Sequence, residues 1–194
     1  MLTYGIIGTA GRDKTKPMTL GLYKWSLAHA YHNIPQGSYV KSGGAAWMDH
    51  LAISLFLFGH VAEITLHLPA PFVDGKFVDS GFKSAGGAAN YYHKRFSEII
   101  GRDTLGQIAG LIKRAEAGDP RIHITYEPAS PGIGGMFARN AKVAIVDKMF
   151  AYTFGEGDQP ADGGTLHTWN LCKGEKTHVT LPNLYTELNK RKGL

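Results

Sequence analysis

The chain has 194 residues, a length that suits one domain and excludes a long multidomain enzyme. With 43% hydrophobic and 19% charged residues, it has ample material for a core and lacks the composition of a disordered protein. The net charge is +5, but residues 173–194 contribute +3 of it, so the rest of the chain lacks the strongly basic balance typical of nucleic-acid-binding domains.

Short apolar runs, glycine-bearing loops and amphipathic stretches follow one another along the chain, a pattern that predicts alternating strands and helices. The expected strands are 3–8, 38–42, 61–68, 121–126, 149–154 and 177–181. The expected helices are 17–32, 45–58, 91–100, 104–117, 136–146, one that follows 163–165, and a short polar one near the C-terminus. This order predicts an α/β fold, a Rossmann-like three-layer sandwich with a mostly parallel central sheet.

We expect a single domain over residues 1–194, with one insertion and a short basic tail. Residues 69–90 are rich in Gly, Pro and Ser and weakly periodic, so they are interpreted as an insertion that could act as a lid. The basic tail is 183–194. No apolar stretch approaches the roughly 20 residues of a membrane span, and Cys172 is the single cysteine. We therefore expect a cytoplasmic protein with no membrane partner and no disulfide.

Four loops with glycines begin after residues 7, 42, 131 and 162, and in a parallel sheet such loops gather beyond the carboxyl ends of the strands. The loop 8–12 combines two glycines with Arg12, which predicts an anion site formed by backbone N–H groups and a guanidinium. The loop lacks the spacing of a dinucleotide fingerprint and the ending of a P-loop. The alternative interpretation is a tight turn with a solvated arginine.

The second loop, 42–45, is made of small residues that would let a helix N-terminus approach a phosphate or a ribose. Asp49 follows on the expected helix, where it would bind sugar hydroxyls or merely cap the helix. Trp47 would stack on a base or, as is common for tryptophan in an apolar helix, belong to the core.

The other two loops also precede expected helices. Arg139, one turn into its helix, is placed to grip a phosphate bidentately, the alternative being a surface salt bridge. Residues 162–165 predict a phosphate cradle, with His167 as donor, base or merely a solvated side chain. The candidate binding residues are Gly8, Thr9, Ala10, Gly11, Arg12, Ser42, Gly43, Gly44, Asp49, Arg139, Asn140, Gly163, Gly164, Thr165 and His167.

No catalytic residue, metal site or cofactor is predicted. The nine histidines form neither a His-x-x-x-His pair nor a zinc helix with a glutamate, and no Gly-x-Ser-x-Gly elbow occurs. Cys172 lacks the surroundings of a reactive thiol and is interpreted as a buried or half-buried side chain.

In order and spacing, residues 7–12, 42–45 with Asp49, 139–140 and 162–165 resemble the SLOG superfamily. This superfamily includes the Lonely-guy enzymes, the DNA-processing protein A family and YspA-like proteins. The resemblance runs from residue 4 to about residue 173 and implies a SLOG-like domain with a Rossmann-like fold. It also implies that the glycine loops bind a nucleotide or an ADP-ribose-like molecule, in a homo-oligomer that is a dimer or tetramer.

The resemblance to Lonely-guy phosphoribohydrolases fails at one position, because His167 stands where their pattern Gly-Thr-x-Glu has the catalytic glutamate. A carboxylate stabilises the positive charge that develops on ribose during N-glycoside cleavage, whereas histidine does not. We therefore expect a protein that binds an ADP-ribose-like or cyclic-nucleotide-type signalling molecule without turning it over. Some relatives sense such signals in antiviral defence, so the expected role is sensing or sequestration.

Two alternatives stay open. One is a nucleotide N-glycosidase in which Arg139 binds phosphate and Asp49 or Glu156 supplies the carboxylate. The other is a single-stranded DNA-binding protein, suggested by the mixed basic and aromatic residues 91–96. The modest charge of the body disfavours nucleic acid as the partner, and such a stretch more commonly buries its aromatic side chains and solvates its cations.

Overall fold

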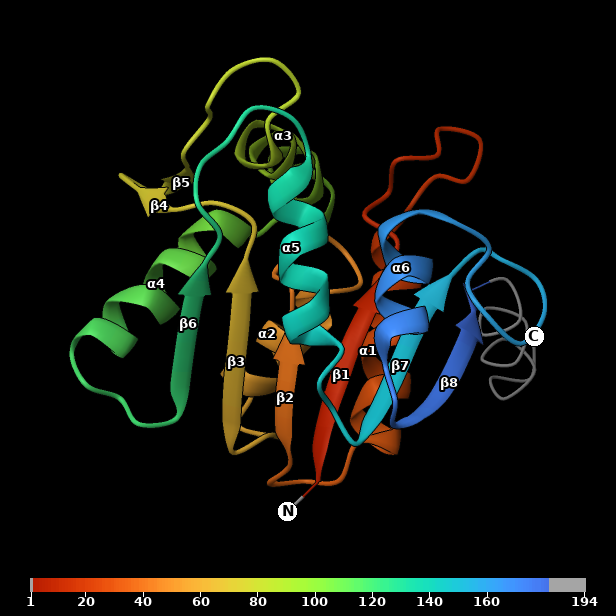
Figure 1. The fold of residues 1–194 in the computed structure, drawn as a ribbon. Helices are drawn as coiled ribbons and strands as arrows, with labels where there is room; N and C mark the ends of the chain where they lie inside the picture. Colours follow the sequence, from red (N-terminus) through yellow and green to blue (C-terminus); the bar gives the residue numbers. More distant parts are fainter. Residues whose placement is uncertain (1, 182–194) are drawn as a thin grey trace.

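The expected α/β fold is confirmed in the computed structural model, which describes residues 2–181 (Figure 1). The large sheet contains β1 (Thr3–Gly8), β2 (Tyr39–Ser42), β3 (Glu63–Leu68), β6 (Ile122–Tyr126), β7 (Lys148–Thr153) and β8 (Glu175–Thr180). The helices are α1 (Leu20–Asn33), α2 (His50–Leu57), α3 (Ala85–Ile100), α4 (Thr104–Glu116), α5 (Gly134–Val143) and α6 (Gly163–Leu171). A small hairpin consists of β4 (Phe72–Val73) and β5 (Lys76–Phe77).

The six strands lie in the order β6-β3-β2-β1-β7-β8, and every neighbouring pair is parallel. From β1 the chain moves outward through β2 and β3 to β6, then returns to the other side of β1 to add β7 and β8. Figure 1 shows α5 and α6 on one face of the sheet and α1 and α2 on the other. The strand order therefore reverses between β1 and β7, which is where ligands bind in sheets of this kind.

Alternate residues of the central strands supply two separate cores, because successive side chains in a strand point to opposite faces. Ile6 of β1 belongs to the larger core, formed with α1, α2 and α4, whereas its neighbour Ile7 belongs to the smaller one. The smaller core includes Val143 of α5 and Trp169 of α6. Burial on both faces explains why these strands appear in the sequence as continuous apolar runs.

Several helix ends differ from the sequence predictions. Helix α5 covers Gly134–Val143 rather than 136–146, and α6 begins at Gly163, within the expected loop 163–165.

The starts of α1, α2 and α3 differ as well. The helix expected from residue 17 begins at Leu20, because the Thr19 side chain accepts a hydrogen bond from the Leu22 N–H and fixes the start there. The helix expected from residue 45 begins at His50, because positive φ angles at Gly44 (64°) and Trp47 (66°) interrupt any earlier turn.

The third helix, α3, begins at Ala85 rather than at residue 91. Ser84 caps it by accepting a hydrogen bond from the Gly87 N–H, so the last part of the expected insertion 69–90 is helical. The rest of that segment includes the β4–β5 hairpin. The expected C-terminal helix and the basic tail 183–194 lie outside the described residues. Across residues 2–181, none of the helices combines the length and the apolar character needed to cross a bilayer.

Candidate functional site

A cleft of about 760 Å³ opens at the carboxyl edge of the sheet and is lined by the ends of both β1 and β7, the strands at the reversal point. Its size lies within the range of small-molecule binding sites. Residues from all four predicted glycine loops or the helices after them line it. The candidate residues that line it are Gly8, Thr9, Ala10, Arg12, Gly43, Asp49, Arg139, Asn140, Gly164 and Thr165.

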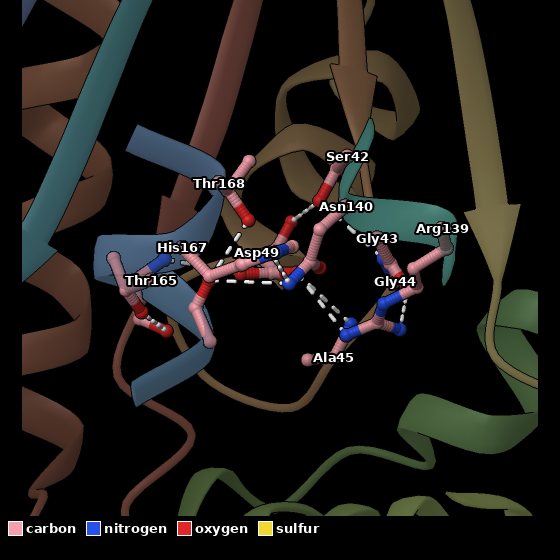
Figure 2. Close-up of polar contacts among 12 residues, drawn as sticks. Ser42, Gly43, Gly44, Ala45, Asp49, Arg139, Asn140, Thr165, His167 and Thr168 are labelled. Carbon is pink, nitrogen blue, oxygen red and sulfur yellow. Dashed lines mark hydrogen bonds and ion pairs between the residues drawn. The ribbon is translucent and has the colours of Figure 1, made fainter. Parts of the chain in front are cut away.

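Asp49 joins the first two loops to each other. Its Oδ1 accepts a hydrogen bond from the Gly8 N–H at 3.1 Å, and its Oδ2 accepts one from the Ala45 N–H at 3.4 Å (Figure 2). The carboxylate makes no capping bond to α2, although Asp49 directly precedes that helix, so the capping interpretation is wrong. An acceptor shared by two loops fixes the turn after β1 against the turn after β2.

Arg139 is the counter-ion of Asp49. Its Nη2 lies 3.9 Å from Asp49 Oδ2, its Nη1 donates to the Gly43 carbonyl, and both charged side chains are 8% exposed (Figure 2). The alternative of a surface salt bridge is therefore wrong, because this is a buried ion pair. Burial raises the pKa of Asp49 and lowers that of Arg139, while the attraction between the two opposes both shifts.

Gly43 has to be a glycine because Arg139 lies directly against it. A Cβ at this position would lie 2.8 Å from Arg139 Cζ and 3.0 Å from Asp49 Oδ2. The Nε of Arg139 is buried and has no hydrogen-bond partner within residues 2–181. One N–H of a cleft-lining guanidinium is thus left for a ligand or a water molecule.

Hydrogen bonds near the start of helix α6 join it to the end of β1 and to α5. The Thr165 hydroxyl donates to the Gly8 carbonyl at 3.1 Å, and Asn140 Nδ2 donates to the Gly164 carbonyl at 3.2 Å. Asp162 precedes the helix but makes no side-chain capping bond in the described chain. The first backbone N–H groups of α6, and the positive end of its dipole, are therefore available to an anion in the cleft.

Arg12 lies beside this helix start. The Cβ of an alanine at Gly163 would lie 2.8 Å from Arg12 Nη2, which places the guanidinium next to the uncapped turn. Arg12 is exposed, lines the cleft and makes no ion pair or hydrogen bond to any residue of the 2–181 region. Lys16 and Lys83 add two further cations to the lining. Asp13 and Asp162 also line the cleft, but Arg12 makes no ion pair with either of them in the described chain, so its guanidinium keeps its N–H groups for a ligand.

Ser42 and Gly44 do not line the cleft, but their hydrogen bonds hold the loop 42–45 in place. The Ser42 hydroxyl donates to the Asp49 carbonyl at 2.9 Å, and the Gly44 carbonyl lies 3.0 Å from His93 Nε2. Because a carbonyl only accepts, Nε2 of His93 carries the proton, and Nδ1 accepts from the Thr104 hydroxyl at 2.9 Å. Burial lowers the pKa of His93 to about 4, so the ring is neutral at physiological pH.

Three other candidates also lie outside the lining. His167 is exposed, its Nδ1 lies 3.3 Å from Asn140 Nδ2, and its ring meets Phe137 edge-on at 5.2 Å. Gly163 adjoins Arg12, as described above, and Gly11 lies over the indole of Trp47. Trp47 is 3% exposed and its ring packs against Phe96 with a centroid distance of 4.5 Å, so the core interpretation holds for its ring.

Sequence reasoning missed the apolar wall of the cleft. Tyr92 of α3, Met136 and Phe137 of α5 and Phe154 after β7 all line it, and aromatic faces of this kind accept a nucleobase by stacking. For Phe154 the sequence contained a signal, because Phe154 and Gly155 come at the end of an apolar strand, where the ligand-binding loops of a parallel sheet begin. Tyr92 belongs to the mixed stretch 91–96, where Phe96 is fully buried and Lys94 and Arg95 are exposed.

The acidic side chains of the lining are Asp13, Asp49 and Asp162. Glu156, the other carboxylate considered for an N-glycosidase, does not line the cleft. Hydrogen bonds from Thr15 lower the pKa of Asp13, which keeps that carboxylate ionised. Within residues 2–181, no three side chains of His, Cys, Asp or Glu gather in a group able to hold a metal ion.

Comparison with known proteins gives a relative that matches along nearly its whole length. The chain is 40% identical over 191 residues to the Uncharacterized protein R261 of Acanthamoeba polyphaga mimivirus. The match covers 91% of this chain and 94% of that protein. No protein-family model and no solved structure matches the chain.

Proposed function

This chain belongs to the same family as the mimivirus protein R261, and we propose that its cleft binds a nucleotide-derived, phosphate-bearing small molecule without turning it over. The observation that carries the proposal is a guanidinium, unpaired within residues 2–181, placed at the start of a helix. There Arg12 lies beside the uncapped start of α6, so a guanidinium and free backbone N–H groups face one space. Both are donors that phosphate oxygens accept from.

The apolar wall supports a nucleotide rather than a bare anion. Tyr92, Phe137 and Phe154 line the same cleft as Arg12, so one ligand with an aromatic base and a phosphate could contact both kinds of side chain. Arg139 would add its unpartnered Nε to the polar contacts near Gly43. The order of the glycine loops, similar to that of SLOG proteins, favours an ADP-ribose-like or cyclic-nucleotide-type ligand that is sensed or sequestered, in a cytoplasmic homo-oligomer.

Binding without hydrolysis is favoured by the state of Asp49. Both of its oxygens accept backbone hydrogen bonds, and Arg139 lies 3.9 Å from one of them. A carboxylate committed to three framework partners is poorly placed to stabilise charge developing on a ribose. Asp49 nevertheless lines the cleft, so N-glycoside hydrolysis is the second candidate function and requires a direct test.

The test is calorimetric titration of the purified protein with AMP and ADP-ribose, followed by chromatography of the same mixtures for released base. We expect binding and no released base. Arg12→Ala should weaken binding, whereas Lys94→Ala should not, because Lys94 is an exposed cation of α3 outside the cleft lining. Failure of the wild type to bind either compound would contradict the proposal. Base released at enzymatic rates, and lost in Asp49→Asn, would establish the hydrolase instead.

A further inference from the structure

A second, smaller pocket of about 240 Å³ adjoins the cleft. Asp13 and Tyr92 line both spaces, so the two meet along these residues. The remaining lining residues are Gly11, Lys14, Pro17, Met18, Trp47, Arg95 and Ile99. The pocket therefore lies between the segment that follows β1 and helix α3. Its lining includes Gly11, a candidate residue that does not line the main cleft.

The indole N–H of Trp47 is a neutral hydrogen-bond donor of this pocket. Trp47 is 3% exposed, and a Cβ at Gly11 would lie 2.7 Å from its Nε1. Gly11, with φ of 71°, thus lets the loop cross the nitrogen-bearing edge of the ring closely. Within residues 2–181, Nε1 donates to no acceptor. A ligand oxygen in the pocket would give this N–H an acceptor.

Two cations line the same pocket as this donor. Lys14 and Arg95 are exposed and line the pocket, and Asp13 is its one acidic lining residue. Asp13 is already bonded to the Thr15 hydroxyl at 2.6 Å and to the Thr15 N–H at 2.9 Å. Arg95 uses Nη1 to reach the Tyr91 hydroxyl at 3.1 Å, which leaves its other N–H groups for a ligand. The chemistry of the pocket is that of a site for an anion.

We propose that this pocket binds a second phosphate of the ligand, so that the ligand is a nucleotide with phosphate groups at two separate positions. The inference rests on the proposed function, because the nucleoside and its first phosphate occupy the main cleft. The second phosphate accepts from Trp47 Nε1 and lies between Lys14 and Arg95. A nucleoside monophosphate fills the cleft alone and leaves the pocket empty.

The test compares AMP with two probes that carry a second phosphate at different spacings, adenosine 3′,5′-bisphosphate and the linear dinucleotide pApA. We expect at least one of the two to bind about tenfold more tightly than AMP. The double variant Lys14→Ala/Arg95→Ala should reduce that advantage to less than about twofold and leave AMP binding unchanged. Lys94→Ala, on the same helix as Arg95 but outside both linings, is the control and should keep the full advantage.

The indole N–H resonance of Trp47, assigned with Trp47→Phe, gives a readout that does not depend on affinity. We expect this signal to shift with the tighter probe and not with AMP. If AMP binds but neither probe gains affinity nor moves the signal, this inference fails and the proposed function stands. If nothing binds, both fail. If a probe moves the indole signal while AMP does not bind, the pocket is an anion site and the assignment of the nucleotide to the main cleft is wrong.

Discussion

The two arginines that line the cleft differ in burial and in bonding partners. Arg139 is buried, donates to the Gly43 carbonyl and pairs with Asp49, whereas Arg12 is exposed and bonds to no residue in the described chain. The first belongs to a framework that holds the loops in place, and the second is free for a ligand. The comparison teaches that burial and existing partners, rather than the presence of a guanidinium, decide which side chain can bind a phosphate.

The largest expected effect is the acid sensitivity of the framework. Burial lowers the pKa of His93 to about 4 and that of His50 to about 3, and in the unfolded chain both titrate near 6.5. The unfolded state therefore binds more protons between these values, and stability is complete above about pH 6.5 and falls as the pH drops toward 4. We expect a loss on the order of 4 kcal/mol between pH 6.5 and pH 4.5.

Urea unfolding at a series of pH values measures this loss. The raised pKa of Asp49 acts in the opposite direction at pH values between 3.8 and the raised pKa, because protonation of its carboxyl is easier in the folded state. The measured change is therefore the net of the two effects, and the same series in Asp49→Asn isolates the contribution of the histidines. Stability that stays level or increases in that variant from pH 6.5 to pH 4.5 would show that the buried histidines are not held neutral.

Arg139→Met should lower the free energy of unfolding by about 3 kcal/mol, because it leaves the buried Asp49 carboxylate without its counter-ion. Arg12→Met should change it by less than about 0.5 kcal/mol, since Arg12 is exposed and unpaired within residues 2–181. Urea unfolding of the two variants compares the arginines directly. If both variants lost the same free energy of unfolding, Arg139 would not be a framework residue that differs from the unpaired Arg12.

Gly43→Ala should destabilise the protein by about 2 kcal/mol, because the added methyl group would collide with Arg139 and Asp49. Gly110→Ala is the matched control. Gly110 lies inside α4, where a Cβ would meet nothing within 4 Å, so alanine should leave stability unchanged or raise it slightly. If thermal unfolding shifts both variants alike, the close approach of Arg139 to Gly43 is not what constrains this turn.

The smallest expected effect concerns binding alone. Arg12→Ala should weaken AMP about tenfold, and Arg12→Lys should recover part of that loss, because lysine keeps the charge but not the forked donor. Calorimetry measures the affinities, and unchanged unfolding curves would show that the loss is local. A lysine variant no better than alanine would mean that charge contributes little at this position.

The sequence predicted the sheet and most of the residues that line the cleft, because both depend on local patterns. The apolar runs around Ile6 and Phe150 mark strands buried on both faces, and the glycine loops after them gather at one edge for topological reasons. The roles of Arg139 and Asp49 could not be predicted. Their pairing joins residues 90 positions apart, and only the packing of α5 against the β2 loop turns a surface-type arginine into a buried one.

The contribution of α3 to the cleft was also beyond the sequence. Ser84 followed by small residues is a helix start that the glycine and serine content of 69–90 concealed. As a result Lys83 and Tyr92, which line the cleft from that side, were not among the candidate residues. Trp47 shows the same limit, because its positive φ and the free edge of its indole follow from tertiary packing rather than from any local signal.

The most direct test of the central claim is mass spectrometry of the small molecules released when the purified protein is denatured, with wild type and Arg12→Ala prepared in parallel. The account predicts a phosphate-bearing nucleotide derivative in the wild-type sample and its depletion in the variant. The same compound in equal amount from both proteins, or a released compound without phosphate, would contradict it.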